Sequence, residues 1–435
     1  MELADLVLLL AVLSAVVVRQ LSGRGPPIWA SFGVGGLLAL ALGLLPLPQA
    51  LGSLGEALTL IEFLLGLFLL TSALERSGAL DHLARWFLGR AGRAEQAPLA
   101  IFLGFGLLST VVLNDALVVV GVPLLLAVGR RLRAPPRPLL LALACGVTVG
   151  SVPTPFGNPQ NLLVALQSGI PLPILLFPRY LLLPTAINLL VGGWLLSKLV
   201  ARGPDRIAPD PTRPPPSRVP LFPPGPWGPR LLRHPVLVLF PATLGAILFE
   251  DVAAGLLHAP GVPLAAIALA GGLVALLLST DRRAVLRGVD VGILLLFAGL
   301  FVMIGLLEYG QPFSGLGLHL PVPSPTDLPA ALGVILGTSL VGSQVVSNVP
   351  WVALQIPFLA QHGFGPGTPV PWMALAGAST LAGNLTLLGA ASNLIVVARA
   401  ESAGVRIRLL EFMRVGVPLT LVTTAILGAL LAVGL

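Results

Sequence analysis

Cysteine, tyrosine and charged side chains are scarce in this chain of 435 residues. It has one cysteine, two tyrosines and 10 % charged residues, against 56 % hydrophobic residues. The single Cys145 excludes a disulfide framework, a thiolate metal site and a cysteine-rich metalloid trap. So few charges cannot cover the surface of a water-soluble globule of this length, and we therefore expect the lipid bilayer to be the main solvent.

Long apolar windows predict an all-α polytopic membrane protein. The windows long enough to cross a bilayer are residues 3–18, 28–45, 58–74, 139–165, 176–199, 235–249, 262–279, 291–307, 373–398 and 412–435. Two further apolar stretches, near residues 98–128 and 328–361, are interrupted by polar residues. We expect these two stretches to form re-entrant hairpins, which enter and leave the membrane on the same side.

The net charge of +7 comes mainly from arginines in the loops between these windows. If the loop after the first span is cytoplasmic and both hairpins are re-entrant, only Arg179 falls outside. Arginines in such loops orient a membrane protein, so the basic balance gives no reason to expect a nucleic-acid partner.

Three separate blocks of sequence recur at nearly the same offset. Gly66-Leu67-Phe68 recurs as Gly299-Leu300-Phe301, Asn114 with Pro123 as Asn348 with Pro357, and Thr154, Gly157 and Asn161 as Thr386, Gly389 and Asn393. The first span of one half runs inward, whereas its counterpart near residue 235 runs outward. The halves are therefore predicted to be inverted repeats, an architecture typical of secondary transporters.

The repeat divides the chain into three predicted parts. Residues 1–201 and 234–435 form the two repeats, each with one re-entrant hairpin and one broken transmembrane helix. Residues 202–233 between them are rich in proline and arginine, and include Pro214-Pro215-Pro216. This composition favours an extended segment that cannot span a membrane, so we expect a cytoplasmic linker.

Polar residues interrupt the apolar pattern at four places, which the repeat groups into two pairs. Residues 113–115 pair with 347–350, and residues 154–161 pair with 383–393. Half-helix ends and asparagine amides at such breaks can bind a small polar solute together with a cation. The predicted solute-binding residues are Asn114, Thr154, Asn158, Asn161, Ser347, Asn348, Asn384, Thr386 and Asn393. For any single asparagine, a hydrogen bond between two helices is an equally good explanation.

Asp115 is a carboxylate inside a predicted membrane segment. Placing a carboxylate there costs at least about 2.5–3.5 kcal/mol, which indicates a functional role. A proton carrier or a cation ligand is the favoured interpretation, and a cap on the helix that follows Asn114 is the alternative. The counterpart of Asp115 is Val349, so only one half carries the charge.

These motifs resemble the ion transporter superfamily, which includes arsenite-pump membrane subunits, divalent anion:sodium symporters and NhaD-type sodium/proton antiporters. The resemblance covers both halves and is closest to arsenite-pump-like (ArsB-type) permeases. It rests on Asn114-Asp115-Ala116-Leu117 with Pro123, on residues 154–161 and on residues 379–393.

The resemblance implies a homodimer in a bacterial inner membrane, in which a transport domain moves as an elevator against a scaffold. It also implies cation-coupling positions, which map to Asn114, Asp115, Gly157, Asn161, Ser347, Asn348, Gly389 and Asn393. The coupling ion would be a proton or sodium, sodium is the one metal expected, and no cofactor is predicted. A soluble ATPase is left open as a further partner.

The expected function is secondary transport of a small inorganic solute, arsenite or a related oxyanion, rather than an enzymatic or channel activity. Arsenite is largely neutral near pH 7, and no lysine or arginine flanks the four breaks to neutralise a dianion. A sodium/proton antiporter and a sodium-coupled, citrate-like di- or tricarboxylate symporter are the alternatives. The chain lacks the His-Glu-x-x-His and Gly-x-Ser-x-Gly motifs expected of an enzyme.

Overall fold

The computed structural model describes residues 2–22, 25–88, 94–132, 134–202, 234–257, 261–310 and 323–434. Within these ranges all regular secondary structure is helical. The predicted linker lies outside the described residues from 203 onward. Six of the described helices are long and apolar enough to cross a bilayer, namely α3, α9, α11, α14, α15 and α19. The prediction of an all-α polytopic membrane protein is confirmed.

The long helices, hairpin helices and broken helices follow the same order in the two halves, whereas the short helices α4, η1 and α13 have no described counterpart. The first half contains α1 (Glu2–Ser22), α2 (Ile28–Ala41), α3 (Leu47–Arg76), α4 (Ala79–Leu88), the short 3-10 helix η1 (Ala94–Gln96), α5 (Ala97–Ser109), α6 (Asn114–Leu132), α7 (Pro136–Gly150), α8 (Pro159–Gln167) and α9 (Pro173–Ala201). The second contains α11 (Val236–Leu257), α12 (Leu264–Leu278), α13 (Arg282–Arg287), α14 (Val291–Gly310), α15 (Leu328–Val346), α16 (Asn348–Gln361), α17 (Pro369–Ala382), α18 (Ala391–Ser402) and α19 (Leu409–Ala432).

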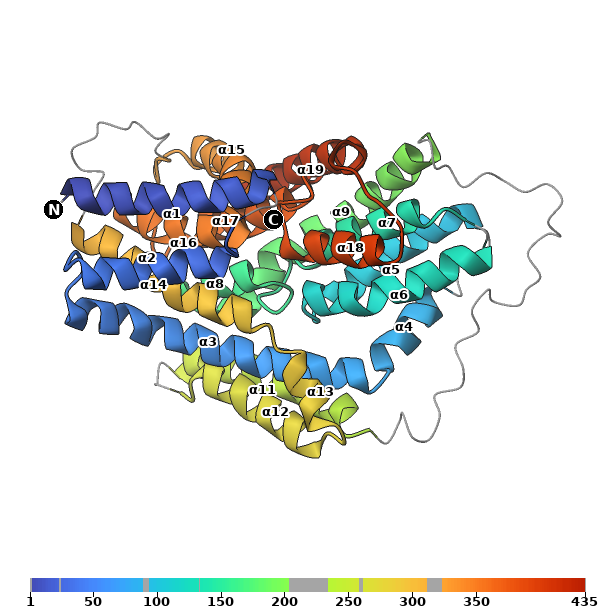
Figure 1. The fold of residues 1–435 in the computed structure, drawn as a ribbon, viewed down its shortest axis with the longest axis horizontal. Coiled ribbons are helices and arrows are strands. Elements are labelled where there is room, and N and C mark those ends of the chain that lie inside the picture. Colours follow the sequence, from blue (N-terminus) through green and yellow to red (C-terminus); the bar gives the residue numbers. More distant parts are fainter. Residues whose placement is uncertain are drawn as a thin grey trace.

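Both expected hairpins and both expected breaks are present. Helices α5 and α6 are joined by residues 110–113, and α15 and α16 by Ser347 alone. The two hairpins lie toward opposite ends of the molecule in Figure 1. The windows at 139–165 and 373–398 are each divided, into α7 with α8 and α17 with α18. In the first break, Pro153 and Pro155 follow the end of α7, and proline removes a backbone donor. In the second break no proline is present, and Gly383 with Asn384 ends α17 because both residues lower helix propensity.

Helices α3 and α14, which are counterparts in the repeat, run antiparallel to each other (Figure 1). The hydroxyl of Ser72, near the end of α3, donates to the backbone oxygen of Val285, just before α14 begins (2.9 Å). A Cβ on Gly305, near the end of α14, would overlap the hydroxyl of Ser53, near the start of α3. The repeats are therefore inverted, as the sequence predicts.

Two equivalent glycines let helices of opposite halves approach closely. A Cβ on Gly66 of α3 would overlap the backbone of Ala268 in α12. A Cβ on Gly299 of α14 would lie 2.6 Å from the backbone nitrogen of Gly33 in α2. The long helix of each half therefore packs against the second helix of the other half. Small residues at such crossings allow the close packing that stabilises membrane helices.

We expect Gly66→Ala to lower the stability of the folded protein by about 1–3 kcal/mol, since the added methyl group must push α3 away from α12. Thermal unfolding of the purified protein in detergent measures this loss. Gly52→Ala in the same helix is the matched control, because a Cβ there meets nothing within 4 Å. Equal unfolding temperatures for the two variants would contradict the close crossing.

A buried carboxylate from α11 caps the N-terminus of α9. Asp251 is 7 % exposed, and its Oδ2 accepts a hydrogen bond from the backbone N–H of Ile174 (3.0 Å). The N-cap residue of α9 itself, Leu172, has a left-handed backbone (φ 51°) and no capping side chain. Helix α9 of the first half is therefore capped by a side chain of the second half. Negative charge at a helix N-terminus is favourable because of the helix dipole.

We expect Asp251→Ala to destabilise the fold by about 1–2 kcal/mol, the usual cost of losing an N-cap. Asp251→Asn retains an oxygen acceptor and should lose less than half as much. The unfolding temperatures of both variants test this. Equal losses would mean that burial of the side chain, rather than the cap, stabilises this contact.

Candidate functional site

The first break, between α7 and α8, is organised by Asn158. Its Oδ1 accepts a hydrogen bond from the backbone N–H of Asn161 (2.9 Å), which caps α8. Its Nδ2 donates to the backbone oxygen (3.1 Å) and the hydroxyl (3.0 Å) of Ser151 at the end of α7. Both ends of this amide are therefore engaged in holding the break together.

Asn161 and its repeat counterpart Asn393 bind the carbonyls that each break sets free. The Nδ2 of Asn161 donates to the backbone oxygens of Ser151 (3.1 Å) and Thr154 (3.1 Å), and also to that of Val152 (3.0 Å). The Nδ2 of Asn393 donates to the oxygens at the equivalent positions, Gly383 (2.7 Å) and Thr386 (3.4 Å). A carbonyl without a partner at membrane depth costs several kcal/mol, and these two amides remove that cost.

Each hairpin tip is hydrogen-bonded to the break of its own half. In the first half, the backbone N–H of Asn114 donates to the oxygen of Gly157 (3.0 Å). The hydroxyl of Thr154 donates to the backbone oxygen of Thr110. In the second half, the hydroxyl of Thr386 donates to the Oε1 of Gln344 (2.8 Å). Thr154 and Thr386 thus play the same part, holding a hairpin tip to a break.

Two features are particular to the second tip. The Nε2 of Gln344 also donates to the backbone oxygen of Ala382 at the end of α17 (2.8 Å). Ser347, the one residue between α15 and α16, has φ 76° and ψ 159°. This conformation is strained for a residue with a side chain, and such strain concentrates at functional sites. The predicted solute ligand Ser347 therefore lies at the most constrained point of the hairpin.

The breaks of the two halves meet at Thr380 in α17. Its hydroxyl donates to the Oδ1 of Asn161 (3.0 Å) and accepts from the amides of Asn158 and Gln160 (both 3.3 Å). Asn384 extends the contact, since its Nδ2 donates to the backbone oxygen of Cys145 in α7 (3.3 Å). Residues of the first break and of the second are thus joined through Thr380 and Asn384, so both breaks form one buried polar centre.

Four predicted ligands keep a buried amide oxygen without a hydrogen-bond partner among the described residues. They are Asn114, Asn348, Asn384 and Asn393, through their Oδ1 atoms. Two are the equivalent residues at the hairpin tips, and two lie in the second break. Amide and backbone oxygens at broken helices are the ligands that transporters offer to sodium. The residues present fit a cation such as sodium, whereas Asn158 and Asn161 already have both amide groups engaged.

Gly157 and Gly389, predicted cation positions, are closely packed in their breaks. A Cβ on Gly157 would lie 2.5 Å from the backbone oxygen of Ser151, and one on Gly389 would lie 2.9 Å from that of Gly383. Neither position has room for a side chain. Both glycines allow the chain to fold back against the preceding helix end, and their part in holding a cation stays a prediction.

Asp115 lies in the first turn of α6 and is partly exposed. The charged group that acts on it is the carboxylate of Asp290, from the other half of the chain. The Oδ1 of Asp290 accepts a hydrogen bond from the backbone N–H of Ile293 and thereby caps α14 (3.1 Å). Two carboxylates that influence each other electrostatically repel when both are ionised, so a proton or a bound cation would relieve the repulsion.

Sequence reasoning missed three residues of this region, Gln344, Thr380 and Asp290. Gln344 occupies the position equivalent to Thr110, so the repeat could have pointed to it. Thr380 lies inside the motif at 379–393 but was not singled out. Because α3 begins at Leu47 rather than near residue 58, exposed Glu62 lies near the middle of the helix.

Comparisons with known proteins agree on a transporter. A family model described as citrate transporter (CitMHS) matches residues 21–377. The Mycobacterium bovis protein Mb2703, named an uncharacterized transporter, is 29 % identical over 380 residues, covering 84 % of this chain and 83 % of that protein. The solved structure of the YdaH transporter of Alcanivorax borkumensis aligns with a TM-score of 0.55 and 16 % identity, over 88 % of this chain and 86 % of that one. MtrF of Neisseria gonorrhoeae aligns with a TM-score of 0.52 and 15 % identity, over 86 % and 80 %. The two structural likenesses concern the fold.

Proposed function

Because this chain belongs to the citrate transporter family, we propose that it is a secondary-active transporter coupling the movement of a small oxygen-rich anion to a proton or sodium gradient. The proposal places the protein as a multi-pass protein of a bacterial plasma membrane, with the segment at 202–233 on the cytoplasmic side. Beyond the function of a membrane transporter, the proposal names a coupling site and a class of cargo.

The single observation that carries the proposal is the set of unpartnered amide oxygens at the hairpin tips. Asn114 and Asn348 are equivalent in the repeat, both are buried, and each has an Oδ1 without a hydrogen-bond partner among the described residues. A buried polar atom without a partner costs about 1–3 kcal/mol. A bound cation would remove this cost at both tips, and Asp115 beside Asn114 would add a negative charge to attract it.

The favoured cargo is a citrate-like carboxylate. The family model is the reason for this choice. No lysine or arginine occurs within residues 110–115, 151–161, 344–350 or 383–393, so the protein itself offers a carboxylate no basic partner there. A carboxylate cargo would then depend on co-bound cations for its charge balance, which is a physical reason for obligatory coupling.

Arsenite is the second candidate cargo, and the same lack of basic side chains favours it. A largely neutral polyhydroxy solute needs hydrogen bonds rather than a cation beside it. The hydroxyls of Thr154 and Thr386 and the asparagine amides supply such groups. The two cargoes therefore differ in whether their binding requires a cation.

We further propose an elevator-type movement within a homodimer. Helices α1–α3 and α11–α14 would form the scaffold, and α5–α9 with α15–α19 the moving transport domain. The supporting observation is that both tips and both breaks are bonded to one another, while α3 and α14 pack mainly on α12, α2 and each other. The two hairpin tips and the two breaks could thus move as one body past the long scaffold helices.

The test is solute accumulation in vesicles that contain the purified protein, with sodium and pH gradients imposed separately. Labelled citrate should accumulate under at least one gradient and not without it. Accumulation of arsenite but not citrate would select the inorganic cargo. Sodium-driven proton movement without any added solute would select a sodium/proton antiporter. Equal flux with and without gradients would contradict coupled transport.

A further inference from the structure

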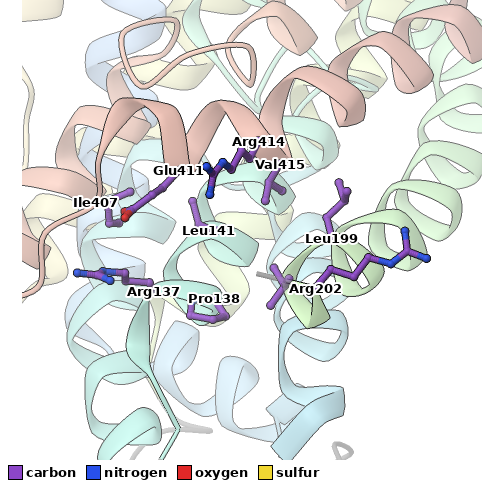
Figure 2. A pocket seen from close by; sticks show the side chains of 10 residues that line it. Arg137, Pro138, Leu141, Leu199, Arg202, Ile407, Glu411, Arg414 and Val415 are labelled. Carbon is purple, nitrogen blue, oxygen red and sulfur yellow. The ribbon is translucent and has the colours of Figure 1, made fainter. Parts of the chain in front are cut away.

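A cavity of about 260 Å³ lies away from the four breaks, between the start of α7, the end of α9 and the start of α19. Its basic lining residues are Arg137, Arg202 and Arg414, and its apolar walls include Leu141, Val200 and Ile407. We call it the arginine pocket. Figure 2 shows side chains from the three helices around it, with Arg414 above Leu141 and Arg137 below Ile407. No residue of the proposed transport site lines it.

The charge balance of the arginine pocket favours an anion. Its lining includes one carboxylate, that of Glu411, and three arginines. The Oε2 of Glu411 already accepts a hydrogen bond from the backbone N–H of Arg408 (3.1 Å), which closes the first turn of α19. Arg137 is oriented by a bond from its Nε to the backbone oxygen of Arg406 (2.7 Å). The N-termini of α7 and α19 add partial positive charge on the same side, and the C-terminus of α9 offsets part of it.

The apolar part of the pocket requires more than a small ion. Beside Ile407, the first turn of α19 exposes Leu409 (42 %) and Leu410 (71 %). Neither leucine lines the pocket. Exposed leucines at the end of a membrane helix face lipid, so an acyl chain that leaves the pocket past Ile407 would meet an apolar surface. A free inorganic anion has no apolar group that could contact these apolar residues. A ligand with a phosphate and an acyl chain would satisfy both parts.

We propose that the arginine pocket binds the phosphodiester headgroup of an anionic phospholipid, with an acyl chain lying along Ile407 and Leu410. Basic pockets between membrane helices on the cytoplasmic side commonly take such headgroups. Arginine suits the role because its planar guanidinium matches phosphate oxygens in pairs. The pocket joins α7, α9 and α19, so the bound lipid would hold three helices together at one membrane surface.

The test is native mass spectrometry of the full chain titrated with phosphatidylglycerol and, separately, with phosphatidylcholine. The wild-type protein should bind phosphatidylglycerol more tightly. The double variant Arg202→Gln/Arg414→Gln should bind it roughly tenfold more weakly, because each arginine near an anionic headgroup contributes substantially. Both side chains are exposed, so their replacement should leave the packing intact. If the double variant is unstable, Arg202→Gln alone should show a smaller loss in the same direction.

The matched control is Arg283→Gln/Arg287→Gln, which removes the same charge from α13 and leaves the pocket unchanged. This control should keep the preference for phosphatidylglycerol. An equal loss in both double variants would overturn the proposal, since the preference would then reflect general surface charge. Complete displacement of the lipid by millimolar inorganic phosphate would also overturn it, because the site would then serve a soluble anion.

Discussion

Replacing Asp115 by asparagine is expected to reduce gradient-driven accumulation of solute by at least roughly a hundredfold, the effect typical of losing a proton-transfer group. The amide has nearly the same size as the carboxylate but cannot carry a proton or a negative charge. Asp115 is the one carboxylate among the residues of the four breaks, and Val349 takes its place in the second half. The initial rate of labelled citrate or arsenite uptake under sodium and pH gradients measures the effect.

Asp81→Asn is the matched control for this experiment. Asp81 is also an aspartate in the first turn of a helix, but it lies on α4 and pairs with Arg85 (2.7 Å) outside the breaks. Exposed pairs of this kind contribute little, so accumulation by this variant should equal that of the wild type. Full accumulation by Asp115→Asn would show that the carboxylate is a helix cap without a coupling role.

The largest loss of stability is expected from Asn161→Ala. Asn161 is fully buried, and its Nδ2 donates to three backbone oxygens, those of Ser151, Val152 and Thr154. Each buried acceptor left without a partner costs about 1–3 kcal/mol, so a total of at least about 3 kcal/mol is expected. The variant should also lose transport, because the first break would no longer hold its shape.

Asn384→Ala serves as the comparison in thermal unfolding. Asn384 is equally buried, but within the described part of the chain its amide makes one long bond, to the backbone oxygen of Cys145 (3.3 Å). Its loss should cost less than half as much as that of Asn161. If both variants unfold at the same temperature, the three carbonyls of the first break must find other donors, and the description of this break is wrong.

The architecture could be predicted from the sequence because the signals were redundant. Prolines and glycines mark the first break, glycines mark the second, and the same polar residues recur in both halves. The start of α3 was missed because its first turns contain Gln49, Gly52, Ser53 and Glu56, which lower the hydropathy of the window. The length of an apolar window reflects hydrophobicity and not helix length. Helix ends that mix polar and apolar residues are therefore left out of the window.

The roles of individual asparagines could not be predicted, because side-chain direction is a property of the fold. Asn161 and Asn393 stand in equivalent positions, yet the Oδ1 of Asn161 accepts from Thr380, whereas that of Asn393 has no partner among the described residues. The residue at the position equivalent to Thr380 is Thr148, whose hydroxyl instead donates to the backbone oxygen of Ala144 (3.0 Å). A small difference in packing therefore separates an amide whose oxygen is hydrogen-bonded from one whose oxygen could bind a cation.

The central claim, that inverted hairpins give alternating access to one buried site, is tested most directly by cysteine labelling at the two tips. The single native thiol, Cys145, is buried and can be replaced by alanine. Val111 and Val345 are equivalent tip residues and are 41 % and 44 % exposed, so each can carry a new cysteine. A membrane-impermeant thiol reagent is then applied to oriented vesicles, with and without the solute and its gradient. If access alternates, the cysteine at 111 should react from the cytoplasmic side and the cysteine at 345 from the opposite side. Any condition that increases the rate of one reaction should decrease the rate of the other. Labelling of both cysteines from the same side, or rates that rise and fall together, would contradict the central claim.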